Sequence, residues 1–290
     1  MSDIGFAGLG RIGLPILNRI RSKFAVKAVY NRNRSKAEGL EGMRVVEEPF
    51  HLGTNCNIIF LALSDDAACE SVIFGQNGIA RTLRPRSLVV NLSTVSHQFA
   101  VSAIRRLQEN MCSYLEAPVQ GGIAMAAEGE LTSFVSGPEE AYKTVSAVIG
   151  TYSSRVIQFK QPGTATKMNL ISNMVAAINL AAVGEAMVMA RKAGITPERA
   201  IEALENSSSA SEVLTAKKET ILSEAYETEF SLNDMAKSLG YSDELSRAMN
   251  SPITMGSVAS QFYTAAMSIG LGNLDFSSVM RAFRFMIGRS

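Results

Sequence analysis

A glycine-rich segment near the start of the chain, Gly8–Gly13, constrains the fold more than any other feature. It follows the apolar run Ile4–Ala7 and opens the segment Leu14–Ser22, so it lies where a buried strand passes into a helix. In such a G-x-G-x-x-G turn the first glycine permits the tight turn, the second lets the backbone approach a pyrophosphate, and the third packs helix on strand. The helix start supplies N–H donors to the phosphates. The predicted dinucleotide-binding residues here are Gly8, Leu9, Gly10, Arg11, Ile12 and Gly13.

The pattern of the chain changes once, near residue 160. Before that point, short apolar runs alternate with segments of helical spacing such as Val101–Glu109 and Glu139–Ile149. Alternation of strands and helices predicts a parallel sheet that is covered on both faces. The predicted strands are Asp3–Ala7, Val26–Tyr30, Ile58–Leu63, Leu88–Leu92, Ser113–Ala117 and Thr132–Ser136.

After Gln161–Gly163 the strand signal nearly disappears. Lys167–Gly194 has the pattern of one long helix, apolar on most sides and ending at a glycine. Thr196 and Pro197 then form a good N-cap and first turn for the next helix. We therefore predict an α/β fold in which a Rossmann-type doubly wound sheet (residues 1–161) precedes an all-α domain (residues 162–290). The long interdomain helix opens the second domain.

Composition excludes several classes of function. The chain of 290 residues has 28 Lys+Arg against 27 Asp+Glu, which leaves a net charge of +1 and little attraction for nucleic acid or a membrane surface. Three cysteines without metal-type spacing and only two histidines predict reduced thiols and no metal site. The first residues lack a signal-peptide pattern, and apolar stretches such as Met174–Ala182 are shorter than a membrane span. We expect a cytoplasmic protein.

The residues after the second predicted strand indicate which dinucleotide binds. A dehydrogenase that prefers NAD places a carboxylate there, about 20 residues past the glycines, on the ribose 2′-hydroxyl. This chain has Asn31 and Arg32 at that point, with Arg34 close behind. A guanidinium can hold a 2′-phosphate, so the sequence favours NADP(H), with Asn31 and Arg32 as cofactor-binding residues. The alternative is a solvated loop whose arginines face water.

Further motifs are spread along the whole chain. They are Val29–Arg32, Asn91–Thr94, Glu116–Gly122, Gly184–Ala186 with Gly194, Phe230–Leu232 with Lys237, and Gly272–Ser277. With the glycine segment, they resemble the β-hydroxyacid dehydrogenases, which include 3-hydroxyisobutyrate dehydrogenase, and Gly272–Ser277 is most similar to the glyoxylate/succinic semialdehyde reductase branch. The resemblance implies an NADPH-dependent oxidoreductase that transfers a hydride to a small carbonyl compound of the semialdehyde, 2-oxo acid or 3-hydroxy acid type.

The resemblance also implies the roles of individual residues and the oligomeric state. The implied catalytic residues are Ser93, Asn169 and Asn173. The implied substrate-binding residues are Gln120, Gly121, Gly122 and Lys237. Further implied cofactor-binding residues are Leu63, Ser64, Thr94 and again Lys237. Because a helix that is apolar on most sides must be buried, and because family members associate through this half, we expect a homodimer or homotetramer.

One departure from the family concerns the catalytic lysine, which members carry near the start of the interdomain helix with an asparagine four residues later. If Lys167 were that residue, the later position would be Ile171. If Asn169 takes the position instead, Asn173 falls at the asparagine and Glu185 falls at the family's next marker. Lys167 and Asn169 are also about 200° apart around a helix. The catalytic lysine is therefore predicted to be replaced by Asn169.

Asparagine cannot donate a proton, which leaves three hypotheses. The first is slow carbonyl reduction, in which Lys167, His97 or Tyr241 could substitute as the acid. The second is imine reduction, because an iminium ion arrives already protonated and imine reductases are relatives that lack the lysine. The third is a cofactor-binding protein that has lost catalysis. Two more departures, Gln120 where the family commonly has serine and Ser238 where it usually has aspartate, fit either a changed substrate or neutral drift.

Overall fold

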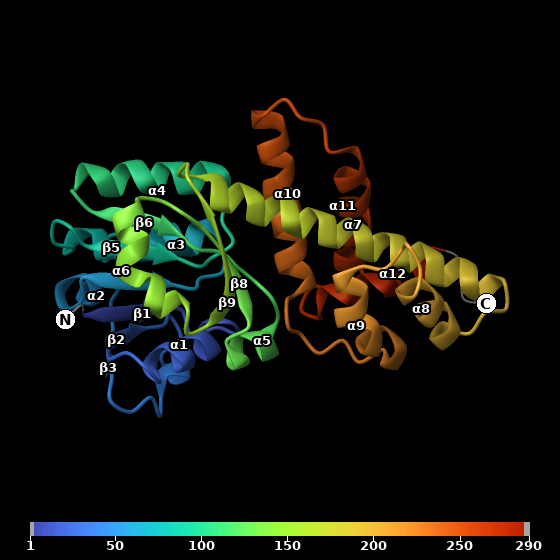
Figure 1. The fold of residues 1–290 in the computed structure, drawn as a ribbon, viewed down its shortest axis with the longest axis horizontal. Helices are drawn as coiled ribbons and strands as arrows, with labels where there is room; N and C mark the ends of the chain where they lie inside the picture. Colours follow the sequence, from blue (N-terminus) through green and yellow to red (C-terminus); the bar gives the residue numbers. More distant parts are fainter. Residues whose placement is uncertain (1–2, 287–290) are drawn as a thin grey trace. The chain divides into compact units, whose positions relative to one another are not determined.

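The computed structural model describes residues 3–286 (Figure 1). The chain divides into two compact units, the first ending at Asn169 and the second beginning at Leu170. We call these unit 1 and unit 2. The boundary falls inside helix α7 (Thr164–Lys192), which begins in unit 1 and continues in unit 2.

Unit 1 is built on one sheet, to which nine strands of the described residues belong, in the order β3-β2-β1-β4-β5-β6-β8-β7, with β9 paired to β8. The strands β1 to β6 pair in parallel, whereas β8 runs antiparallel to β6 and β7 and parallel to β9. The order 3-2-1-4-5-6 is that of the doubly wound dinucleotide-binding fold. The strands are β1 (Ile4–Ala7), β2 (Val26–Tyr30), β3 (Arg44–Val45), β4 (Ile58–Leu61), β5 (Leu88–Asn91), β6 (Ser113–Glu116), β7 (Val119–Gln120), β8 (Leu131–Ser136) and β9 (Ser153–Phe159).

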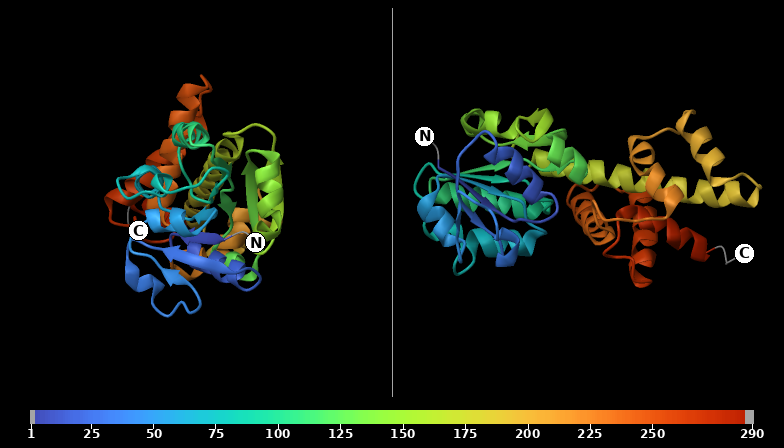
Figure 2. Two further views of the ribbon diagram at one scale, coloured as in Figure 1. Left: turned by 90° about the vertical axis from the view of Figure 1, so that its left-hand side faces the viewer. Right: turned by 90° about the horizontal axis from the view of Figure 1, so that it is seen from below.

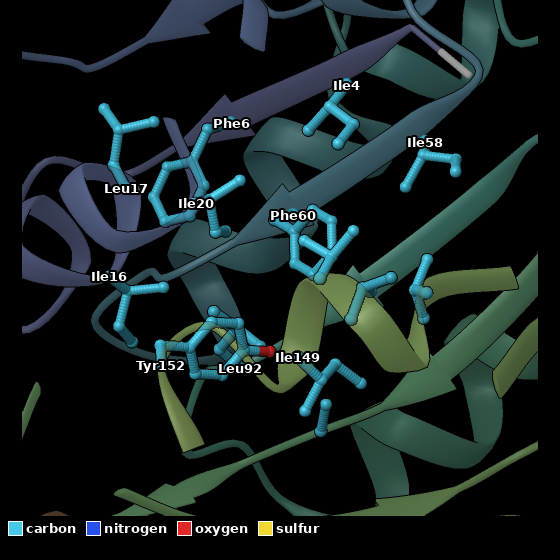
Figure 3. Close-up of a cluster of buried hydrophobic side chains, with 14 of the residues drawn as sticks. Ile4, Phe6, Ile16, Leu17, Ile20, Ile58, Phe60, Leu92, Ile149 and Tyr152 are labelled. Carbon is cyan, nitrogen blue, oxygen red and sulfur yellow. The ribbon is translucent and has the colours of Figure 1, made fainter. Parts of the chain in front are cut away.

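Helices cover both faces of this sheet (Figure 2). They are α1 (Gly13–Arg21), α2 (Phe50–Asn55), α3 (Asp66–Phe74), α4 (His97–Glu109), α5 (Ile123–Glu128) and α6 (Glu139–Ile149), with short 3-10 helices η1 (Arg34–Ala37) and η2 (Ile79–Arg81). Successive side chains of β4 point to opposite faces of the sheet and belong to two separate apolar clusters. Phe60 lies in the cluster with residues of α1 and α6 (Figure 3), and Leu61 lies in the cluster with residues of α2, α3 and α4. Strand β4 is apolar throughout because both of its faces are buried.

Unit 2 is helical throughout its described residues. After α7 come α8 (Pro197–Glu205), α9 (Glu212–Ser223), α10 (Leu232–Ala248), α11 (Thr254–Ser268), η3 (Phe276–Ser278) and α12 (Val279–Met286). One apolar cluster forms its core, including Leu180 of α7, Leu239 of α10 and Tyr263 of α11. The loop before α10 is fixed by Asp275, a fully buried carboxylate that accepts from the Glu229 N–H at 3.2 Å and from Lys217 Nζ at 3.1 Å.

The predicted fold class is confirmed: a Rossmann-like sheet within residues 4–159 precedes an all-helical part that opens with a 29-residue helix. Each of the six predicted strands is present. The pattern did not predict β3, β7 or β9, because β3 and β7 have two residues each and β9 is mostly exposed or half-buried. The long helix starts earlier than predicted, at Thr164, and Gly194 follows its end with a φ of +78°.

Helix α7 is longer than the short apolar stretches considered from the sequence alone. Among the described residues, it is the one helix that could cross a membrane by length and composition, and 33% of its most apolar window is buried. Core helices of water-soluble proteins meet the same criterion, so the finding is weak evidence for a membrane span.

Candidate active site

The glycine segment forms the turn between β1 and α1. Its three glycines differ in what a side chain at each position would contact. Gly8 has a φ of +100°, and a Cβ on it would lie 2.1 Å from the carbonyl oxygen of Ala62. A Cβ on Gly13 would lie 2.0 Å from the carbonyl oxygen of Gly8. Around Gly10 no atom lies within 4 Å of the Cβ position. The fold therefore requires the first and third glycines, whereas the second keeps a space open above the backbone, which fits the approach of a pyrophosphate.

The N-terminus of α1 also fits the binding of a phosphate group. No side chain caps this helix, and no acidic residue lies in its first turn. Uncapped N–H groups and the positive end of the helix dipole favour an anion at this position. The segment Gly8–Gly13 therefore fits the phosphates of a dinucleotide by both shape and charge.

Asn31 connects the end of β2 to the glycine segment. Its Oδ1 accepts a hydrogen bond from the Leu9 N–H at 2.8 Å, and its Nδ2 donates to the carbonyl oxygen of Asn33 at 2.7 Å. The side chain thus holds the turn in place from within the protein.

The two arginines of the same loop differ in their partners. Arg34 Nη1 lies 2.8 Å from Glu47 Oε1. Arg32 is exposed and makes no ion pair with any residue that the structure describes. Of the two guanidinium groups, Arg32 is therefore the one whose charge is not already balanced.

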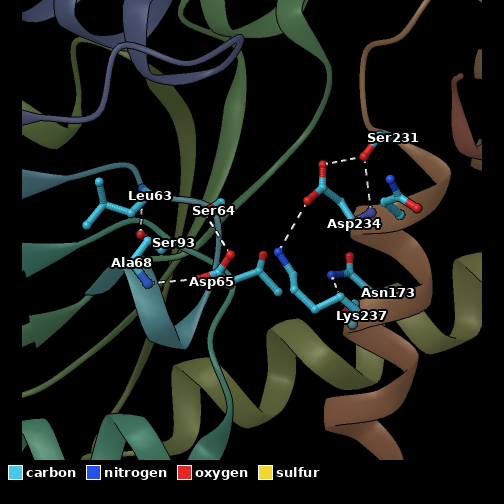
Figure 4. A network of polar contacts seen from close by, with 12 residues as sticks. Leu63, Ser64, Asp65, Ala68, Ser93, Asn173, Ser231, Asp234 and Lys237 are labelled. Atoms are coloured by element: carbon cyan, nitrogen blue, oxygen red, sulfur yellow. Dashed lines mark hydrogen bonds and ion pairs between the residues drawn. The ribbon is translucent and has the colours of Figure 1, made fainter. Parts of the chain in front are cut away.

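Leu63 and Ser93 are held together beyond the ends of β4 and β5 (Figure 4). Leu63 N–H donates to Ser93 Oγ at 2.8 Å, and Ser93 N–H donates to Asn91 Oδ1 at 3.0 Å. Ser64 donates to Asp65, which also caps α3 by accepting from the N–H of Ala68 at 2.7 Å. These bonds fix the backbone beside the glycine turn, since β4 is the neighbour of β1.

Asn169 lies in the second turn of α7 and is 1% exposed. Its side-chain amide has two partners in unit 1. Gln120 Nε2 donates to Asn169 Oδ1 at 2.7 Å, and Asn169 Nδ2 donates to Thr94 Oγ1 at 3.3 Å. The structure thus brings together three of the residues predicted from the sequence, from three separate segments. None of the three side chains carries a proton that can titrate near neutral pH.

Glu116 at the end of β6 fixes the start of α7. Its buried carboxylate accepts from the backbone N–H groups of Gly163 at 2.5 Å and Thr166 at 3.1 Å, and from the hydroxyl of Ser136 at 2.5 Å. A carboxylate at a helix N-terminus satisfies N–H groups that have no partner within the helix and also matches the helix dipole. Sequence reasoning assigned Glu116 no role. The available signal was a carboxylate inside a buried strand, which requires donors.

The candidate substitute acids in unit 1 lie beside this helix start. Lys167 is in the first turn of α7, and His97 begins α4. A Cβ on Gly163 would lie 2.9 Å from the ring of His97. Burial lowers the pKa of His97, and so does the nearby charge of Lys167. The ring atom Nδ1 of His97 has no hydrogen-bond partner among the described residues, and neither side chain is bonded to the amide of Asn169.

The predicted site residues of unit 2 lie on α7 and α10. Asn173 Nδ2 donates to Ser238 Oγ at 3.0 Å, and Ser238 is fully buried. Lys237 Nζ lies 3.2 Å from Asp234 Oδ1 in the first turns of α10 (Figure 4). Tyr241 follows in the same helix. Among residues 3–286, no group of three His, Cys, Asp or Glu side chains could hold a metal ion.

Comparison with protein families identifies the chain. Residues 3–160 match the NAD binding domain of 6-phosphogluconate dehydrogenase, and residues 163–283 match the family described as NAD-binding of NADP-dependent 3-hydroxyisobutyrate dehydrogenase. The chain is also 30% identical to L-threonate dehydrogenase of Cupriavidus necator, over 97% of this chain and 96% of that protein. The chain belongs to the β-hydroxyacid dehydrogenase family.

Two solved structures have folds similar to that of this chain. Psf3 in complex with NADP⁺ and 2-OPP has a TM-score of 0.87 at 24% identity, covering 97% of this chain and 100% of that one. An imine reductase from Pseudomonas sp. has a TM-score of 0.62 at 19% identity, covering 98% and 99%. Both share the fold. Family membership makes the protein an oxidoreductase of the NAD(P)-dependent type, and the matches described as NAD-binding cover both residues 3–160 and residues 163–283.

Proposed function

We propose that this protein is an NADPH-dependent reductase of small carbonyl compounds in which Asn169 replaces the family's catalytic lysine. The single observation that carries the proposal is the amide of Asn169, which is buried and held by Gln120 and Thr94. A site that had lost its function would have little reason to keep a buried polar group with bonded partners on two other segments, since buried polar groups are costly unless satisfied.

The glycine segment and Arg32 are the residues that would hold the cofactor. The open space at Gly10 and the uncapped α1 fit the phosphates, and the unpaired guanidinium of Arg32 fits a 2′-phosphate. No carboxylate follows β2 to repel that phosphate. Bound NADPH supplies the hydride. We therefore expect NADPH to bind more tightly than NADH.

Asn169 would act on the substrate by donating a hydrogen bond to the carbonyl oxygen. One N–H of its Nδ2 goes to Thr94, and the second is not used by a described residue. Loss of a general acid typically costs about 10²–10⁴ in rate, and a fixed neutral donor at the developing oxyanion contributes about 10²–10³. The carbon receives the hydride and the oxygen takes its proton from water, so the reaction is expected to be slow but measurable.

Imine reduction is the second candidate, and the same network favours it in one respect. Gln120, Thr94 and Asn169 offer no titratable proton, and a substrate that arrives protonated needs none.

The family branch remains part of the proposal: Gly272–Ser277 favours the glyoxylate/succinic semialdehyde reductases. We further propose a cytoplasmic homodimer or homotetramer that contacts neither nucleic acid nor a membrane, which light scattering at micromolar concentration would test.

The test is NADPH oxidation by the purified protein, after NADPH binding has been confirmed by fluorescence. Glyoxylate, succinic semialdehyde and a cyclic imine are assayed in parallel with the native protein and with Asn169→Lys. Slow aldehyde reduction that Asn169→Lys accelerates would support the proposal. Reduction of only the imine would assign the second function. NADPH binding without any turnover by the native protein, with turnover by Asn169→Lys, would establish a binding protein that has lost catalysis.

A separate substitution tests the preference for NADPH over NADH. Arg32→Gln should weaken NADPH binding by about 10–100-fold, because a charge-assisted hydrogen bond contributes about 1.5–3 kcal/mol and 1.4 kcal/mol is tenfold. NADH binding should change little. Arg34→Gln, whose guanidinium is already paired with Glu47, is the matched control. Equal NADPH affinity in native protein and Arg32→Gln would refute the assignment.

A further inference from the structure

We propose that Gln120 determines which atom of the Asn169 amide is presented at the reacting centre, and thereby selects carbonyl compounds over protonated imines. The inference rests on the proposed function and deepens it by naming a specificity-determining residue. It is carried by the two hydrogen bonds of Asn169, which come from opposite ends of one amide group.

A side-chain amide has two orientations of nearly equal shape, and the neighbours decide between them. Asn169 is 1% exposed, so water has little access to it. The hydroxyl of Thr94 can donate or accept and therefore accommodates either orientation. In the structure Gln120 directs its donor end, Nε2, at Asn169, and Asn169 directs Oδ1 toward Gln120. The nitrogen Nδ2 is then directed toward Thr94.

This orientation has a chemical consequence at the residue that replaces the lysine. With Nδ2 on the Thr94 side, Asn169 offers an N–H to a reacting atom, which matches the lone pairs of a carbonyl oxygen. In the opposite orientation it would offer Oδ1, which matches the N–H of an iminium ion. Gln120 acts through Asn169 and is in this respect a positioning residue, although the two lie 49 positions apart in the sequence.

Gln120→Glu tests the proposal with the smallest change of shape. A carboxylate only accepts, so Asn169 would have to turn its Nδ2 toward position 120 and its Oδ1 toward Thr94. The matched control is Gln108→Glu, which makes the same chemical change at an exposed position of α4. Gln120→Met, which can neither donate nor accept strongly, serves as a second variant if Gln120→Glu does not fold.

Two readouts are needed. In the ¹⁵N-labelled protein without cofactor, the side-chain amide signal of Asn169 is identified by its loss in Asn169→Asp. Its N–H resonance should move downfield in Gln120→Glu, where it is bonded to a carboxylate, and should stay in place in Gln108→Glu. In Gln120→Met the signal should lose the native shift. These spectra require no turnover, so they test the orientation even if the proposed reaction fails.

The second readout is the ratio of kcat/KM for an aldehyde to that for a cyclic imine. Gln120→Glu should lower this ratio by about 10–100-fold, because a hydrogen bond to a charged group contributes about 1.5–3 kcal/mol and each 1.4 kcal/mol is tenfold. An unchanged Asn169 signal, or a ratio within twofold of the native one, would overturn the proposal. A shifted signal with no turnover of either substrate by any variant would refute the proposed function while leaving the orientation established.

Discussion

The three glycines of the β1–α1 turn lead to a prediction that separates folding from cofactor binding. Gly8→Ala would introduce a side chain at a φ of +100° and place its Cβ 2.1 Å from the carbonyl oxygen of Ala62. Gly10→Ala would place a methyl group where no atom lies within 4 Å. The same substitution is therefore expected to act on stability at one position and on binding at the other.

The magnitudes follow from these geometries. At Gly8, a strained backbone costs about 1–3 kcal/mol, and forcing extra volume against fixed backbone costs about 1–3 kcal/mol more. A loss of about 3 kcal/mol lowers Tm by roughly 6–12 °C in a domain of this size. At Gly10, stability should change by no more than about 0.5 kcal/mol. A methyl group in the space for the pyrophosphate that displaces one charge-assisted hydrogen bond should weaken NADPH binding about 10–100-fold.

The assay is thermal unfolding of each variant, followed by fluorescence titration with NADPH. Gly150→Ala is the control, because it adds a methyl group in unit 1 at an ordinary contact distance of 3.5 Å, outside the turn. It should change neither quantity by much. Native-like NADPH affinity in Gly10→Ala would refute the assignment of this turn as the phosphate site. A native-like Tm in Gly8→Ala would refute the steric reasoning.

Three further predictions concern buried charges and a half-buried imidazole. Glu116→Gln should destabilise unit 1 by about 2–4 kcal/mol in calorimetry, because backbone donors of α7 lose a charged acceptor; Ser136→Ala should cost less, and an unchanged Tm would contradict the anchoring role. Lys217→Met leaves the buried carboxylate of Asp275 without its cation and should cost about 3–5 kcal/mol in denaturant unfolding, with partial recovery when Asp275→Asn is added. His97 has a lowered pKa, so the unfolded chain binds its proton more readily than the folded protein. Stability should fall as the pH drops below about 6.5, and His97→Gln should flatten the dependence of Tm on pH between 5.5 and 7.5.

Much of the fold could be predicted because its signals are local. The apolar strands of a doubly wound sheet are buried on both faces and stand out as continuous runs, and the glycine turn marks where the first strand ends. The strand β9 escaped prediction because its burial depends on where the sheet ends. Gln120 lies in a two-residue strand whose pairing with Thr132 is set by the return of β8 along the sheet. No periodicity within two residues can indicate such a strand.

For the candidate site, too, local spacing was visible in the sequence whereas long-range contacts were not. The spacing of Asn169, Asn173 and Glu185 along one helix is the basis for predicting that Asn169 takes the place of the family's lysine, and this stays a prediction. The contact of Asn169 with Gln120 and the anchoring of α7 by Glu116 depend on long-range packing, so the sequence alone could not supply them.

The contacts bear on whether the departures from the family pattern are drift. Gln120 and Asn169, which we propose stand where the family has serine and lysine, are bonded to each other. Ser238 replaces an expected aspartate, is fully buried, and is bonded to Asn173. One positive and one negative charge are thus removed together, and each replacement has a polar partner. An unsatisfied buried polar group costs about 1–3 kcal/mol, so the buried side chains of Asn169 and Ser238 need such partners. On the proposed assignment, each replacement has a hydrogen-bond partner within its own unit, which offsets the cost of burying Asn169 and Ser238.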